Sequence, residues 1–152
     1  MGEPQYTPVD LTELGLDQIL SDKFLICDGG IHRKHPKAPV TGGYMSFHFQ
    51  YNGAVFRLIK HENGAKSSND SEYLSLIYSI QGMVFNARYQ SVFPGTIIFM
   101  DSKLVVNQVN GIWRVNAQHL IPHVLVCKRL IKDYQLELKW IPRKVVFEVL
   151  GH

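Results

Sequence analysis

Cysteines are scarce in this sequence and long apolar runs are absent, which narrows the classes of protein to which it can belong. The two cysteines, Cys27 and Cys127, are too few and too far apart for a disulfide framework or a zinc-type ligand pair. No run of about 18 apolar residues occurs, as a membrane span needs. The first residues, MGEPQYTPVD, lack the basic-then-apolar pattern of a signal peptide. We therefore expect a cytoplasmic protein whose cysteines are small apolar residues.

A large net charge is also absent, but the charge is unevenly distributed. The formal net charge is +3 over 152 residues. Residues 1–102 hold 8 basic and 10 acidic side chains, whereas residues 103–152 hold 8 and 3. A basic C-terminal third can attract a polyanion such as nucleic acid. The same charges also fit a solvated helix face around Lys128, Arg129 and Lys132. Charge alone therefore does not distinguish a nucleic-acid-binding surface from an ordinary solvated one.

Apolar periodicity and turn signals predict one mixed α/β domain, residues 23–152, after an N-terminal arm, residues 1–22. An Asn-Gly turn separates two alternating runs and predicts a hairpin. The predicted order is three antiparallel strands (24–27, 44–51, 54–59), a helix (68–85), a strand (97–100), two helices (103–109, 118–133) and an alternating segment (134–141). This order predicts a mixed sheet with helices packed on it.

Two of these segments have a predicted apolar face. Spacing near 3.6 residues in the helix 68–85 places one face along Leu74, Ile77, Tyr78, Gln81 and Phe85. Alternation in 134–141 places Leu136, Leu138 and Trp140 on one side, so we expect Trp140 in the core.

Three carboxylates lie near the ends of predicted elements. Asp28 follows the apolar strand FLIC and precedes Gly-Gly, which is ordinary turn chemistry. Glu72 lies three residues after Asn69, the spacing of a capping box. Asp101 follows the apolar run IIFM and can help to start the next helix. Each carboxylate alone has an ordinary structural interpretation.

The three carboxylates together favour a metal site. If the first and fourth strands are parallel neighbours, Asp28 and Asp101 emerge at the same edge of the sheet, where the first helical turn can bring Glu72. Carboxylates this close repel one another unless a positive charge lies among them. A site of oxygen ligands without His or Cys selects a hard cation, so we expect Mg²⁺ or Mn²⁺.

The stretches CDGG, SSNDSEYLSLIYSI, IIFMDSKLVVNQVNG, NGIWRVNAQHLIPH and LKWIPR occur in that order. This ordered set resembles type 1 ribonuclease H, in particular its shorter bacterial, archaeal and plant-like members without the basic protrusion. The resemblance covers roughly residues 23–143. It implies a ribonuclease H-like mixed sheet, with three antiparallel strands followed by parallel strands and helices packed on both faces.

The resemblance implies an endoribonuclease that cleaves the RNA strand of RNA–DNA hybrids by two-metal hydrolysis, leaving 5′-phosphate and 3′-hydroxyl ends. Asp28 would bridge two Mg²⁺ ions, with Mn²⁺ as a substitute, and Glu72 and Asp101 would hold one of them. One ion lowers the pKa of the attacking water and the other stabilises the leaving oxygen.

The resemblance also implies a set of substrate contacts: Gly29, Gly30, Ser68, Asn69, Ser102 and Arg143. Glycines allow the backbone to approach RNA closely. Ser68 and Asn69 would hydrogen-bond the 2′-hydroxyls that distinguish RNA from DNA. The basic C-terminal third would hold phosphates.

The C-terminal segment departs from the family pattern. The chain reads PRKVVFEVLGH where short members carry a fourth carboxylate. Aligning the terminal V-L-G places Glu148 there, as a catalytic residue and metal ligand. The alternatives are an exposed Glu148 in an apolar C-terminal strand, with His152 as another possible ligand. The family's catalytic-loop histidine is also missing, and Arg143 and Lys144 lie nearby in sequence.

Two other functions stay open. The missing aspartate fits a catalytically weakened ribonuclease H-like module that binds nucleic acid or a protein partner. A 3′–5′ exonuclease on the same fold ranks lower, because the DGG strand end lacks the usual D-x-E pair. The loop HRKHP, with His32 and His35, could contact phosphate or a metal, although loop histidines are more often solvated. Oligomeric state has no sequence signal.

Overall fold

The computed structural model describes residues 8–21, 23–51, 53–86 and 94–152. In these residues no helix is long and apolar enough to cross a membrane. The elements in chain order are β1 (Lys23–His32), β2 (Gly42–Tyr51), β3 (Ala54–Glu62), α1 (Ser68–Asn86), β4 (Ile97–Met100), α2 (Lys103–Val109), a 3₁₀ turn (Gln118–Leu120), α3 (Ile121–Asp133), β5 (Glu137–Trp140) and α4 (Arg143–Leu150).

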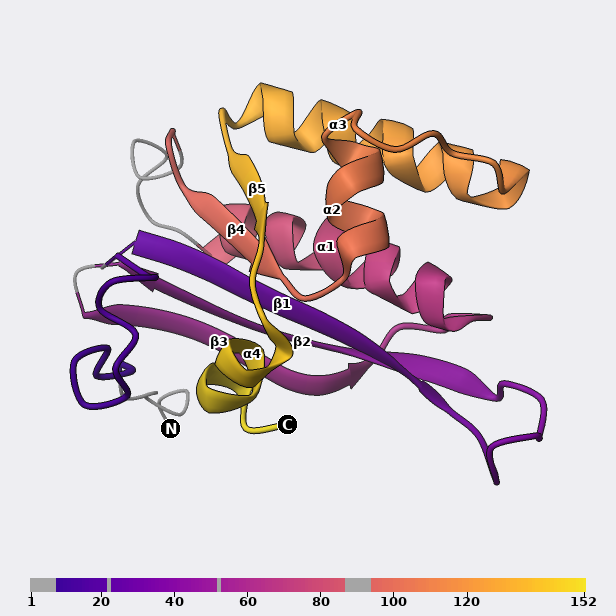
Figure 1. Ribbon diagram of the computed structural model, residues 1–152, viewed down its shortest axis with the longest axis horizontal. Coiled ribbons are helices and arrows are strands. Elements are labelled where there is room, and N and C mark those ends of the chain that lie inside the picture. The colour runs from indigo at the N-terminus through magenta and orange to yellow at the C-terminus, as the bar shows by residue number, and fades with distance from the viewer. Residues whose placement is uncertain (1–7, 22, 52, 87–93) are drawn as a thin grey trace.

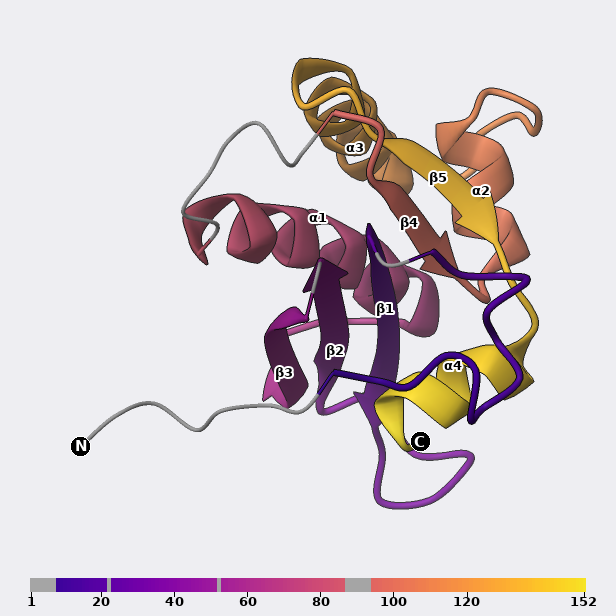
Figure 2. The ribbon, with the colours of Figure 1, turned by 90° about the vertical axis from the view of Figure 1, so that its left-hand side faces the viewer.

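The five strands form one mixed sheet in the order β3-β2-β1-β4-β5 (Figures 1 and 2). The β1–β2 and β2–β3 pairs are antiparallel, whereas β4 pairs in parallel with both β1 and β5. Helices α1, α2 and α3 lie on one face and α4 lies on the other. This arrangement confirms the predicted mixed sheet with helices on both faces.

Strand β1 is longer than predicted. It runs to His32, and Asp28, Gly29 and Gly30 pair with Ser46, Met45 and Tyr44 of β2. The prediction that the strand ends at Cys27 in an Asp-Gly-Gly turn is therefore wrong. The antiparallel partner β2 satisfies the backbone of β1 past the point where β4 ends, so the glycines continue the strand.

Helix α1 packs unusually close to β1 because the contact is made by small residues. A Cβ on Gly29 would lie 2.5 Å from both the Ser71 carbonyl oxygen and the Ser75 hydroxyl. Ser71, Ser75 and Ser79 are spaced by one helical turn and are fully buried. Gly29 is therefore required for the close approach of α1 to β1.

The predicted apolar face of α1 is correct at Ile77, which is buried, but wrong at Tyr78 and Phe85. Phe85 is 88% exposed and Tyr78 is 39% exposed, although both belong to that face. The buried apolar side chains of the helix are Tyr73, Leu76, Ile77, Ile80 and Met83. The helix turns Ser71 and Ser75 toward Gly29 of β1, and this rotates the buried face away from Tyr78 and Phe85.

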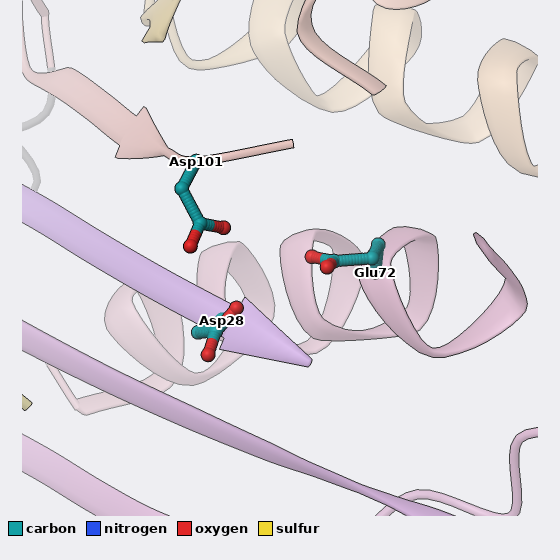
Figure 3. Close-up of side chains that lie close together, drawn as sticks. All are labelled: Asp28, Glu72 and Asp101. Atoms are coloured by element: carbon teal, nitrogen blue, oxygen red, sulfur yellow. The ribbon is translucent and has the colours of Figure 1, made fainter. Parts of the chain in front are cut away.

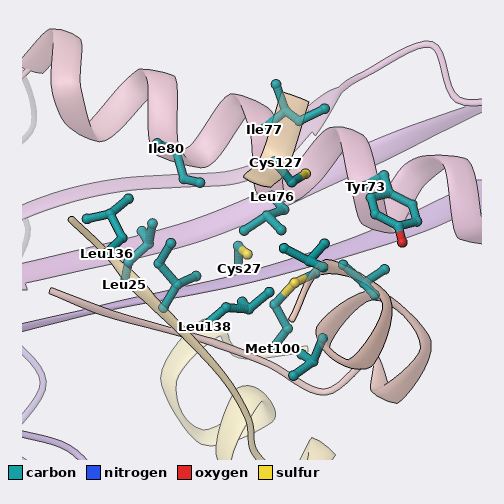
Figure 4. Close-up of a cluster of buried hydrophobic side chains, with 14 of the residues drawn as sticks. Leu25, Cys27, Tyr73, Leu76, Ile77, Ile80, Met100, Cys127, Leu136 and Leu138 are labelled. Atoms are coloured by element: carbon teal, nitrogen blue, oxygen red, sulfur yellow. The ribbon is translucent and has the colours of Figure 1, made fainter. Parts of the chain in front are cut away.

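The main core lies between the sheet and the layer of α1, α2 and α3 (Figure 4). Cys27 and Cys127 are fully buried in it, which confirms their assignment as small apolar residues. Burial raises the pKa of the Cys127 thiol to about 12. The labelled members in Figure 4 include Leu25, Leu76, Ile80, Met100, Leu136 and Leu138.

A second core covers the opposite face of the sheet. Here α4 packs through Val145, Val146, Val149 and Leu150 against Phe24, Ile26 and Phe99. Leu11, Leu16 and Leu20 of the N-terminal arm are buried in the same cluster. The C-terminal segment is thus an amphipathic helix, and its interpretation as an apolar strand is wrong.

A buried polar network ties this second layer to the sheet. Arg57 donates from Nη1 to the Val149 carbonyl (2.7 Å) and from Nη2 to the Leu150 carbonyl (3.1 Å). Arg57 Nη1 also lies 3.0 Å from His48 Nδ1, and His48 Nε2 lies 2.9 Å from Gln50 Oε1. Gln50 in turn bonds both backbone groups of Val9. One chain of contacts therefore joins the end of α4 to the N-terminal arm.

Candidate active site

Asp28, Glu72 and Asp101 meet at one edge of the sheet (Figure 3). One carboxylate oxygen from each residue lies within 4.8 Å of the other two. All three side chains are partly buried. The structure therefore brings together three of the four carboxylates that the sequence predicts as metal ligands.

The parallel pairing of β1 and β4 positions the two aspartates. The β1–β4 pairing ends with Ile26 opposite Phe99. Asp28 comes two residues after Ile26, and Asp101 comes two residues after Phe99. The Trp140 indole N–H donates to the Asp101 carbonyl (3.0 Å). Trp140 is 41% exposed, so its prediction as a core residue is wrong. Instead, Trp140 holds the turn that presents Asp101.

Asp101 is not the cap of α2. The N-cap is Ser102, whose hydroxyl accepts the Val105 N–H at 3.3 Å. The Asp101 carboxylate is therefore available to the cluster, as the sequence predicts.

Glu72 is likewise not part of a cap with Asn69. The Ser67 hydroxyl accepts the Asp70 N–H (3.1 Å), and Asp70 Oδ2 accepts the Lys66 N–H (2.8 Å). These bonds satisfy the start of α1 two residues before the predicted cap. Glu72 can therefore turn toward the aspartates.

Ser71 fixes the first turn of α1 to the sheet. Its hydroxyl lies 2.7 Å from the Gly30 carbonyl and 3.1 Å from the Tyr44 carbonyl, and it accepts from Asn63 Nδ2 at 2.9 Å. The backbone that carries the neighbouring Glu72 is thereby held against β1.

The cluster is electrostatically unfavourable without a cation. Burial, together with the charges of Asp28 and Asp101, raises the pKa of Glu72 to about 9. Burial and the charge of Asp101 also raise the pKa of Asp28 well above its usual range. The Gly29 N–H and the Arg143 charge oppose both rises in pKa. Burial therefore destabilises the charged form of these carboxyls by more than the Gly29 N–H and the Arg143 charge stabilise it.

The donor set fits a hard divalent cation. Glu72 Oε2 is buried and has no hydrogen-bond partner among the described residues. A buried acceptor of this kind is costly unless a ligand satisfies it. Three carboxylates with no nitrogen or sulfur ligand favour Mg²⁺ or Mn²⁺.

The structure does not bring Glu148 or His152 into this cluster. Glu148 is exposed on α4 and is not among the grouped carboxylates. His152 Nε2 lies 2.7 Å from the Ser46 hydroxyl. The residue of α4 that acts on the cluster is Arg143, whose charge lowers the pKa of both Asp28 and Glu72.

The predicted substrate residues lie around the cluster in different settings. Ser68 and Asn69 are exposed in the first turn of α1, and Arg143 is exposed at the start of α4. Ser102 is the cap of α2. Gly30 lies against the ring of Tyr44, which would clash with a Cβ. Internal packing thus accounts for both Gly29 and Gly30, without a substrate.

Sequence reasoning missed a pocket next to the first turn of α1. The pocket has a volume of about 560 Å³ and is lined by Asn69 together with Leu104, Gln108, Ile112, Trp113, Arg114, Asn116, Ala117 and Leu120. Asp70, the residue after Asn69, has its Oδ1 atom 2.6 Å from His123 Nε2. Asp70 and His123 are 53 residues apart, so no local spacing could have indicated the pair.

Comparison with solved structures identifies the architecture. Ribonuclease H1 from Halobacterium salinarum superposes with a TM-score of 0.67 at 20% identity, over 84% of this chain and 92% of that one. The fold is ribonuclease H-like. LC11-RNase H1 in complex with an RNA/DNA hybrid gives 0.64 at 21% identity, over 80% and 86%. No family model matches the chain.

A ribonuclease H domain from Mycobacterium tuberculosis is also similar to this chain, with a TM-score of 0.60 at 20% identity, over 82% of this chain and 92% of that one. Identities near 20% establish the ribonuclease H-like fold. What the chain does must therefore be argued from its own residues.

Proposed function

We propose that the protein is a divalent-metal-dependent endoribonuclease that cleaves the RNA strand of RNA–DNA hybrids. The observation that carries this proposal is the convergence of Asp28, Glu72 and Asp101 within 4.8 Å, with an unpartnered buried oxygen on Glu72. The ribonuclease H-like fold supports the hydrolase over other uses of an acidic site. One similar protein has been solved with an RNA/DNA hybrid bound.

In this proposal the three carboxylates hold the metal at the edge of the sheet. Bound Mg²⁺ or Mn²⁺ would supply an attacking water of lowered pKa and stabilise the charge on the leaving 3′ oxygen. Asp28 would be shared between ions, because its strand passes through the cluster. Trp140 and Ser71 keep Asp101 and Glu72 in place.

Selectivity for RNA is assigned to the exposed polar residues beside the metal ligands. Ser68 and Asn69 stand in the turn of α1 that carries Glu72, so their side chains are available to 2′-hydroxyls near the cut. Arg143 and Lys144 are exposed at the start of α4 and provide charge for phosphates.

A specific observation favours a second candidate, the catalytically weakened binding module. The described cluster has three carboxylates rather than four, and Glu148 is exposed elsewhere on α4. A second ion would then have fewer protein ligands, which lowers its affinity. This module would bind hybrid and cleave it slowly or not at all.

One assay separates these functions. End-labelled RNA–DNA hybrid, double-stranded RNA and double-stranded DNA are incubated with Mg²⁺, Mn²⁺ or EDTA, and binding is measured in parallel. The proposed enzyme cuts only the RNA strand of the hybrid, and EDTA abolishes the cuts. Binding without cleavage in either metal would support the module, whereas comparable cleavage of double-stranded DNA would contradict the hybrid-specific proposal.

A further inference from the structure

The β1–β2 hairpin extends away from the body of the molecule (Figure 1). Strand β1 passes through the cluster at Asp28 and continues to His32, and residues 33–41 form the tip that leads to β2. At about 3.3 Å per residue, His32 lies ~13 Å beyond Asp28 along the strand. The tip therefore lies outside the candidate metal site, but it directly follows the strand that carries Asp28.

The hairpin belongs to a stretch with basic charge and no acidic side chain. Residues 29–61 contain Arg33, Lys34, Lys37, Arg57 and Lys60, and no Asp or Glu. Lys34 and Lys37 are exposed at the tip, and within the described part of the chain neither forms an ion pair. A long segment of one sign of charge attracts a polyanion.

The tip is a folded structure. Thr41 donates from its backbone N–H to the His32 carbonyl (2.9 Å), and Ala38 donates to the His35 carbonyl (2.9 Å). Arg33 Nη1 donates to the carbonyls of Pro36 (3.2 Å) and Ala38 (3.3 Å), so its guanidinium serves the loop itself.

The base of the tip is also fixed, because His32 Nε2 lies 2.9 Å from Glu62 Oε1 on β3. Lys34 and Lys37 therefore project from an ordered base, which reduces the entropy lost when they bind a ligand.

We propose that Lys34 and Lys37 at the hairpin tip form a phosphate-backbone contact for the hybrid, several nucleotides from the cut. This inference rests on the proposed function for the identity of the duplex. Phosphates follow one another at about 3.4 Å per strand along a duplex axis. The proposal places β1 along the duplex axis, so a reach of ~13 Å corresponds to about four nucleotides between the scissile phosphate and the tip.

Lysines at the tip contact phosphates alone, so they increase affinity without reading the sequence or the 2′-hydroxyl. They also contribute affinity for the duplex in a chain whose sequence lacks a basic protrusion between Asn107 and Pro122. The contact should therefore affect binding of every duplex but cleavage only of the hybrid.

The first test measures binding of a ~20-base-pair hybrid in EDTA, so that no metal and no cleavage are involved. The variant is Lys34→Ala with Lys37→Ala. Because each phosphate contact contributes close to one to the salt slope, the slope of log affinity against log salt should become shallower by about two. The ratio of wild-type to variant affinity should then narrow roughly 15-fold between ~50 and ~200 mM salt.

The matched control removes a positive charge at the opposite edge of the sheet. Lys23 begins β1, and parallel strands start at the edge away from the acidic cluster. Lys23→Ala should leave the salt slope within about half of one contact. An unchanged slope in the tip variant, or an equal change in the control, overturns the proposal.

The second test uses the positions of the cuts on an end-labelled hybrid with Mg²⁺. The tip variant should lose internal cuts several-fold but keep cuts that have fewer than about four base pairs on the tip side. Equal loss at every position overturns the assigned reach. If the wild-type protein does not cleave the hybrid, the proposed function fails. The binding test in EDTA still decides whether Lys34 and Lys37 contact the duplex.

Discussion

The two helical layers are attached to the sheet by different means. On one face α1 lies against β1 through Gly29 and the buried serines, and a large apolar core surrounds this contact. On the other face α4 has a smaller apolar core, and its C-terminal carbonyls are held by Arg57. Close packing fixes position to a fraction of an ångström, whereas a polar tether depends on charge and protonation.

This difference matches what each layer carries. The α1 face positions Glu72 beside Asp28 and Asp101, where small displacements would change binding of the proposed metal. The α4 face presents Arg143, whose charge acts on the cluster over a longer range. We therefore expect substitutions on the α1 face to impair the site and substitutions on the α4 face to impair stability.

The largest expected effect is on the cluster itself. Asp28→Asn removes a shared negative charge without changing volume, so hydrolysis should fall at least ~100-fold, as the loss of several kcal/mol of transition-state stabilisation requires. Mg²⁺ should raise the melting temperature of wild type but not of the variant. Asp133→Asn, an exposed carboxylate on α3, is the control. Activity of Asp28→Asn within a few-fold of wild type would contradict the metal assignment.

On the α4 face, Arg57→Ala should reduce the free energy of unfolding by about 2–3 kcal/mol, because it leaves buried acceptors on Val149 and Leu150 unsatisfied. Denaturant unfolding measures the loss, and amide exchange should accelerate in α4 before it does in α1. Arg129→Ala, which breaks only an exposed pair with Asp133, should cost less than about 0.5 kcal/mol. Equal losses in the free energy of unfolding for Arg57→Ala and Arg129→Ala would show that Arg57 does not hold α4 on the sheet.

The same tether should make stability depend on pH. Burial lowers the pKa of His48 to about 4, and the Arg57 charge lowers it further. Between pH ~6.5 and ~4 the unfolded chain binds a proton at His48 that the folded chain does not, so stability falls as pH falls through this window. The loss should be about 3 kcal/mol by pH 4.

His48→Gln removes this titration and should flatten the acid limb of the stability curve. The measurement is the denaturant midpoint at several pH values for both proteins. An acid limb as steep in the variant as in wild type would show that other groups dominate.

Gly29→Ala tests the close packing on the α1 face. Its Cβ would overlap the Ser71 carbonyl, which is backbone and cannot move alone, so we expect a cost of about 1–3 kcal/mol. Because the shift displaces the turn that carries Glu72, the Mg²⁺ concentration for half-maximal activity should rise. Gly42→Ala, where a Cβ meets its neighbours only at 3.8 Å or more, is the matched control. If Gly29→Ala lowers stability but leaves the Mg²⁺ dependence unchanged, the close packing of α1 on β1 does not position Glu72.

The sequence was sufficient for the order of elements as far as β5, through apolar runs and an Asn-Gly turn, and for the three carboxylates, through the apolar runs before Asp28 and Asp101 and the ordered motifs that resemble ribonuclease H. It was insufficient where tertiary packing overrides local pattern. The face of α1 was predicted from its large apolar residues, but close contact with Gly29 favours serines there. The tether of Arg57 to α4 spans 92 residues and has no local signature.

The C-terminal segment shows the same limit at the candidate site. Family spacing placed Glu148 as a fourth ligand, yet α4 is a helix whose Val145, Val146, Val149 and Leu150 are buried together. That apolar face fixes the rotation of the helix. Glu148 consequently falls on the exposed side, away from the grouped carboxylates.

The smallest expected effect follows from this rotation. Glu148→Gln should change hydrolysis less than about twofold across a Mg²⁺ titration, because exposed substitutions rarely disturb a distant site. Glu72→Gln, the same chemical change inside the cluster, should abolish the Mg²⁺-induced rise in melting temperature. It should also stabilise the metal-free protein at neutral pH, because Glu72 adds a buried carboxyl to two others. A large loss in Glu148→Gln that high Mg²⁺ restores would instead show that α4 turns Glu148 toward the metal when substrate binds.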